Sequence, residues 1–67
     1  MNIYTFDNFW ESYHMLTCIN KTHKELCKQL WDKTIREHHI KAFRLIQDYK
    51  HKRLNAYEYL QEVFKFD

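Results

Sequence analysis

The sequence predicts an all-α protein, a small three-helix bundle built on a long central helix. Three observations lead to this fold class. The chain contains neither glycine nor proline, which argues against β-hairpins and favours helices joined by short polar turns. Apolar residues recur at steps of three and four along most of its length. Twelve aromatic residues among 67 supply the large burial per side chain that a domain near the lower size limit needs.

The first helix is expected over about residues 6–18. Thr5 or Asp7 can cap its start, because both side chains accept hydrogen bonds from free backbone amides. The segment 19–21 that follows is short, so the first two helices are expected to be antiparallel neighbours. The apolar stripe of this helix consists of Phe6, Phe9, Trp10, Tyr13, Leu16 and Thr17.

The central helix is expected over about residues 23–50. Thr22 and Glu25 have the spacing of a capping box at its start. A helix of this length would extend about 45 Å, so a break near residues 36–39 is the alternative, with Thr34 and Glu37 as a second capping box. Continuity is favoured because the stripe keeps its phase throughout. That stripe comprises Cys27, Trp31, Ile35, His38, Ala42, Leu45, Ile46 and Tyr49.

The last helix is expected over about residues 56–65, after a segment at 50–54 in which the stripe is lost. Asn55 and Glu58 are spaced as a capping box. The sequence shows no repeat or linker, so residues 1–67 are expected to form a single helical domain. The stripe of the last helix consists of Ala56, Leu60, Val63 and Phe64.

The net charge is only +2, but it is unevenly distributed. Residues 21–53 carry ten Lys and Arg against four acidic residues, whereas both flanking segments are net acidic. The sequence has no apolar run long enough to span a membrane and no signal-peptide pattern at its start. A cytoplasmic location with Cys18 and Cys27 reduced is therefore expected.

The outer face of the central helix is the leading candidate site. Basic side chains interleaved with apolar ones are typical of a helix that binds an acidic or apolar groove on a larger protein. The alternative is that the last helix covers Ile40 and Phe43 and leaves an ordinary solvated basic rim. The predicted partner-binding residues are Lys33, Arg36, Ile40, Phe43 and Arg44.

A second candidate site is the basic cluster Lys50, Lys52 and Arg53, which also includes His51. Consecutive cations can bind phosphates and give salt-dependent nucleic-acid binding without sequence preference. The alternative is a solvated turn, favoured by the attraction of cations to the C-terminal end of the preceding helix. The small net charge weakens the nucleic-acid interpretation.

Two pairs of potential metal ligands, His14 with Cys18 and His23 with Cys27, each have i, i+4 spacing. On two antiparallel helices they could converge on one tetrahedral zinc site. The spacing matches no known zinc finger, and buried or half-buried thiols are the simpler interpretation. No metal or other cofactor is therefore expected.

The sequence favours a non-enzymatic role. His38 and His39 are adjacent, so they point about 100° apart on a helix, and no orienting residue or oxyanion-hole turn accompanies any Cys and His pair. The leading hypothesis is a small binding factor that occludes or redirects a larger protein, possibly a phage or mobile-element inhibitor of a host protein. Nucleic-acid binding is the alternative, and a homodimer formed through the aromatic surplus is a third possibility.

Overall fold

The computed structural model describes residues 2–65. Within that range all regular structure is helical, which confirms the all-α prediction. Five α-helices and one 3₁₀ turn replace the three helices expected. They are α1 (Phe6–Thr17), α2 (Lys24–Asp32), α3 (Arg36–Arg44), α4 (Ile46–Tyr49), the 3₁₀ turn η1 (Lys50–Lys52) and α5 (Ala56–Val63).

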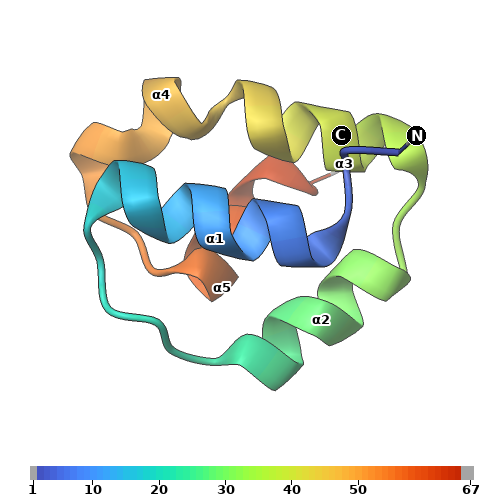
Figure 1. Cartoon of the computed structure of the whole chain (residues 1–67), viewed down its shortest axis with the longest axis horizontal. Coiled ribbons are helices and arrows are strands. Elements are labelled where there is room, and N and C mark those ends of the chain that lie inside the picture. Colours follow the sequence, from blue (N-terminus) through green and yellow to red (C-terminus); the bar gives the residue numbers. More distant parts are fainter. Residues whose placement is uncertain (1, 66–67) are drawn as a thin grey trace.

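The helices are arranged around α5. Figure 1 shows α3 and α4 along one edge of the molecule, α2 along the opposite edge, and α1 crossing in front of α5. α2 packs mainly on α5, which also contacts α1 and α3. The first two helices are therefore not the closely packed antiparallel pair that the short connection suggested. None of the helices is long and apolar enough, among the residues described, to cross a membrane.

The start and end of α1 lie where the sequence predicted them, to within one residue. The Thr5 side chain caps the helix by accepting a hydrogen bond from the Asn8 amide at 3.2 Å. The helix ends at Cys18, whose φ of 58° is in the left-handed region that glycine usually occupies at this position. One face of α1 is completely buried, and it consists of Phe6, Phe9, Trp10, Tyr13, His14 and Thr17.

The expectation of one continuous helix over residues 23–50 is wrong. The chain turns at residues 33–35 between α2 and α3, and a second irregularity at Leu45 separates α3 from α4. The whole molecule is only 29 Å along its longest axis, so a straight helix of that length would project beyond the domain. The chain instead folds back and places α2 and α3 on opposite sides of the core.

The turn between α2 and α3 is held by hydrogen bonds to the carbonyl of Trp31. The Thr34 amide donates to it at 3.2 Å and the Thr34 hydroxyl at 2.8 Å. His39 returns from the first turns of α3, where its Nε2 lies 2.9 Å from the same oxygen and its ring stacks on Trp31 with centroids 4.0 Å apart. These hydrogen bonds satisfy the Trp31 carbonyl oxygen, which has no partner within α2, and the helix ends there without a glycine or proline.

The two capping boxes predicted inside the central segment do not form. α2 begins one residue after His23, which has a left-handed backbone (φ 61°) and no side-chain cap. α3 begins after Ile35, again without a side-chain cap, because the Thr34 hydroxyl bonds backward to Trp31. The box predicted at the last helix does form: Asn55 accepts from the Glu58 amide at 2.8 Å, and Glu58 accepts from the Asn55 amide at 3.2 Å.

The core is mainly aromatic and is centred on Phe9. Its ring, which is fully buried, lies within 5.2 Å of the Trp31 ring and within 5.9 Å of the Tyr59 ring, centroid to centroid. Two tyrosine hydroxyls bridge separate elements, Tyr13 donating to the Leu54 carbonyl and Tyr59 to the Ala42 carbonyl. Each buried hydroxyl thus has a partner, and these bonds tie α3 and the segment before α5 to the core.

Candidate protein-binding surface

The solvent-facing side of α3 and α4 has a shallow hollow of about 490 Å³. Each lining residue has another lining residue three or four positions away in the sequence, which places them on one side of a helix. Half-buried Ile40 and Leu45 form the apolar part, and four exposed charged residues surround them. We call this surface the α3 face, and it consists of Glu37, Ile40, Lys41, Arg44, Leu45 and Asp48.

The four charged groups of the α3 face take part in no ion pair within residues 2–65. Glu37 and Lys41 have the same i, i+4 spacing as Lys28 and Asp32 on α2, which do bond, at 2.8 Å. The other ion pairs of the described chain, Lys21 with Glu11 and Lys65 with Glu62, also lie elsewhere. The charges of the α3 face therefore remain available to another molecule.

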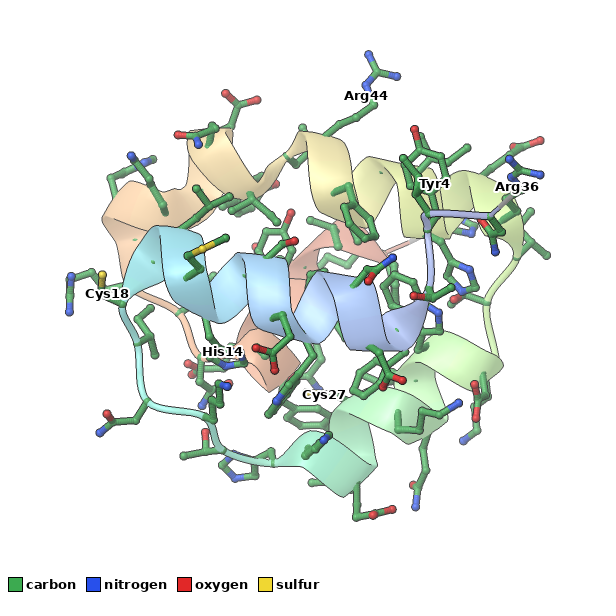
Figure 2. All side chains as sticks on the ribbon, viewed as in Figure 1. Tyr4, His14, Cys18, Cys27, Arg36 and Arg44 are labelled. Atoms are coloured by element: carbon green, nitrogen blue, oxygen red, sulfur yellow. The ribbon has the colours of Figure 1, made fainter. Side chains whose placement is uncertain are left out.

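All five residues predicted to bind a partner lie on or beside α3 and are at least partly exposed to solvent. Ile40 and Arg44 line the hollow, and Figure 2 shows the Arg44 side chain extending away from the ribbon. Arg36 lies at the far end of α3, where its guanidinium is 6.0 Å from the centre of the Tyr4 ring. Lys33 lies in the turn before α3 and is exposed.

Phe43 has a different environment from the one expected. Its ring packs inward, with centroids 5.3 Å from Tyr4, 6.1 Å from Phe9 and 6.3 Å from Trp31. The prediction placed it outward because it plotted residues 23–50 on one helical wheel. The turn before α3 ends that common phase, so a face defined on α2 does not continue onto α3.

The surface also includes Glu37, Lys41, Leu45 and Asp48, which were not among the predicted partner-binding residues. Their spacing places them on one face of any helix that runs through residues 37–48, but the apolar stripe defined over residues 23–50 centres the predicted outer face on a neighbouring side. Leu45 was predicted in the core stripe, and it does pack against the core, while its half-buried side chain also lines the hollow. The missing information was therefore the position of the turn, and not the identity of the residues.

The second predicted site, the basic cluster, is exposed to solvent. Lys50 and Lys52 lie on η1, and Arg53 follows it with a left-handed backbone of φ 54°. A hollow of about 300 Å³ lies between this cluster and the end of α1, where Leu16 is partly exposed. Lys52 turns back over the Tyr49 ring, with Nζ 4.8 Å from its centre, so the cations do not all point in one direction.

The four residues of the possible zinc site do not come together, so that alternative is wrong. Cys27 is in the core, whereas Cys18 is exposed at the end of α1 (Figure 2). His23 stacks on Tyr57, with ring centroids 6.0 Å apart. Burial raises the pKa of the Cys27 thiol to about 11, which disfavours the thiolate that zinc requires. Residues 2–65 contain no group of three or more His, Cys, Asp or Glu placed to hold a metal.

His14, the remaining candidate ligand, is a structural residue of α1. Its Nδ1 donates to the Trp10 carbonyl at 2.7 Å, because a carbonyl oxygen can only accept. The other ring nitrogen, Nε2, is buried without a hydrogen-bond partner. Burial lowers the pKa of His14, so the neutral ring is favoured in the folded protein.

Comparison with known proteins identifies one matching family. The family described as Legionella vir region protein LvrA C-terminal domain matches residues 2–63. No curated protein and no solved structure matches the chain.

Proposed function

We propose that this chain, which belongs to the LvrA C-terminal domain family, is a non-enzymatic binding module that docks on a larger protein through the α3 face. The observation that best supports this proposal is an apolar hollow surrounded by four charged side chains, which make no ion pair among the described residues.

The composition of the α3 face suits protein recognition. Ile40 and Leu45 provide apolar area that a partner can cover, and the charged residues around them provide orientation and selectivity. Arg44 is a suitable anchor because arginine is enriched where binding energy is concentrated at interfaces. By covering such a surface the protein would occlude or redirect its partner, and a phage or mobile-element factor acting on a host protein would work in this way.

Affinity capture with matched surface variants tests this function. Ile40→Asp with Arg44→Glu makes the charge of the α3 face more negative by three. Lys24→Glu with Leu26→Asp makes the same change in charge on the exposed side of α2, where both residues are exposed. We expect a stoichiometric protein partner that survives nuclease and moderate salt, is lost with the α3 variant, and is retained with the α2 variant.

Circular dichroism of both variants verifies that each keeps the helical content of the wild-type chain. Equal loss of the partner in the two variants would indicate a general effect of charge, and retention in both would place the binding surface elsewhere. Either result would contradict the proposed use of the α3 face.

The second candidate function is nucleic-acid binding through Lys50, Lys52 and Arg53. The supporting observation is that all three are exposed at one end of the molecule and make no ion pair among the described residues. Replacing all three with glutamine should remove binding to a nucleic-acid duplex if this function is real. Binding that is insensitive to salt, or unchanged in the triple variant, would contradict it, since phosphate contacts weaken steeply as salt is raised.

A further inference from the structure

The order of charges along the α3 face limits what can bind there. From the start of α3 to α4 the residues are Glu37, Lys41, Arg44 and Asp48, so the signs run negative, positive, positive, negative. At 1.5 Å per residue this row is about 16 Å long, with Ile40 and Leu45 beside its centre. The face is therefore as long as about three turns of a second helix.

A second copy of the chain matches this row poorly. When two copies of the face pair antiparallel over their full length, Lys41 meets Arg44 of the other copy and Glu37 meets Asp48. When they pair in parallel, each residue meets itself. Both arrangements place like charges opposite each other, which is destabilising, and specific interfaces avoid such pairs.

Resting on the proposed function, we propose that the α3 face binds an amphipathic helix of another protein that is acidic at its centre and basic at its ends. Acidic side chains of that helix would lie opposite Lys41 and Arg44, and basic ones opposite Glu37 and Asp48. Apolar residues between them would cover Ile40 and Leu45. This pattern reads the same in both directions, so the charges select the partner's sequence without fixing whether it runs parallel or antiparallel.

Selection from a displayed library of single-helix peptides tests the inference, whatever the identity of the natural partner. The full chain is used as bait, in wild-type form and as the variant Glu37→Lys, Lys41→Glu, Arg44→Glu and Asp48→Lys. This variant inverts the charge pattern and leaves the net charge unchanged, so general electrostatic attraction is the same for both baits. All four residues are exposed, so the fold should persist.

We expect the wild-type bait to select peptides with acidic centres and basic ends, and the inverted bait to select the reverse pattern. Each selected peptide should bind the other bait about tenfold more weakly or worse, because opposed like charges add to the loss of the original pairs. Binding of the selected peptides should also be lost with Ile40→Asp, which places them on the α3 face.

The outcomes separate this inference from the function on which it rests. Peptides that require Ile40 but show no charge preference, or the same preference with both baits, would overturn the inference and leave protein binding by the α3 face intact. Peptides whose binding is indifferent to Ile40→Asp, or the absence of any selected peptide, would count against both. A dimer of the free chain in light scattering that is lost with Ile40→Asp would overturn the argument against a second copy.

Discussion

α1 and α3 have similar amphipathic patterns and opposite roles in the molecule. α1 buries six residues, including the fully buried Phe9 and Tyr13, whereas α3 buries only Ala42. Most of the apolar stripe of α1 packs into the core, with Leu16 as its exposed member, whereas most of α3 remains half-buried or exposed. A helical repeat in the sequence therefore indicates that a face exists, and packing against the rest of the chain decides whether that face stabilises the fold or binds another molecule.

The largest expected effect is a loss of stability when a core aromatic residue of α1 is truncated, compared with the same change on α3. Phe9→Ala should destabilise the fold by about 3–5 kcal/mol, because it removes a fully buried ring stacked against Trp31 and Tyr59. For a domain this small, such a loss is comparable to the total stability. Phe43→Ala, at a half-buried position on α3, should cost about 2 kcal/mol. Urea unfolding followed by circular dichroism measures both, and equal losses would contradict the contrast between α1 and α3.

The next effect concerns the turn that separates α3 from α2. His39→Ala removes both the hydrogen bond to the Trp31 carbonyl and the ring stack on Trp31. The expected loss is about 1–2 kcal/mol in the free energy of unfolding. His51→Ala, at an exposed histidine on η1, is the matched control and should change stability little. If the two substitutions had the same effect, His39 would not be what holds the turn.

An effect of pH on stability is expected from His14 on α1. Burial lowers the pKa of His14 below its ordinary value of 6.5. As pH falls, the unfolded chain therefore takes up this proton before the folded one does. The stability associated with neutral His14 should be complete above about pH 6.5 and should decline as pH falls toward the lowered native pKa.

Replacing His14 with phenylalanine tests this effect, because it keeps an aromatic ring against Trp10 and removes the titrating group. Unfolding free energies measured between neutral and mildly acidic pH should fall less steeply in the His14→Phe protein than in the wild type. Identical slopes would show that His14 does not contribute to the acid sensitivity.

The smallest expected effect is on the α3 face itself. Lys41→Glu with Arg44→Glu should change the free energy of unfolding by no more than about 0.5 kcal/mol, since both side chains are exposed and make no ion pair among the described residues. Urea unfolding measures this directly. A loss as large as that of His39→Ala would mean that these cations stabilise the fold and are not reserved for binding.

The sequence was sufficient to predict α1 and α5 but not the path between them. Both helices have a side-chain cap and a stripe that is largely buried, so local signals and tertiary packing agree. The break after Trp31 has no glycine or proline to mark it. It depends on His39, eight residues later in the chain, and on aromatic packing between separate helices, neither of which a helical period can indicate.

The same cause explains how much of the candidate site could be predicted. Ile40 and Arg44 were identified because they lie on the outer side both of the expected long helix and of α3. Phe43 was misassigned because the two helices differ in phase at its position. Residues whose orientation is set by α3 alone, such as Lys41, could be recognised only after the turn was located.

The left-handed backbones of Cys18, His23 and Arg53 also have a consequence for protein engineering. Residues with a β-carbon are strained in this conformation, and this glycine-free chain places them at three of its helix ends. Replacement by glycine at any of these junctions would exchange steric strain for backbone entropy, at a gain of about 1 kcal/mol or less. The three junctions lie outside both the aromatic core and the α3 face. Glycine at Cys18 or His23 therefore offers a route to a more heat-resistant version of the domain that leaves the α3 face unaltered, whereas glycine at Arg53 would also remove a cation of the basic cluster.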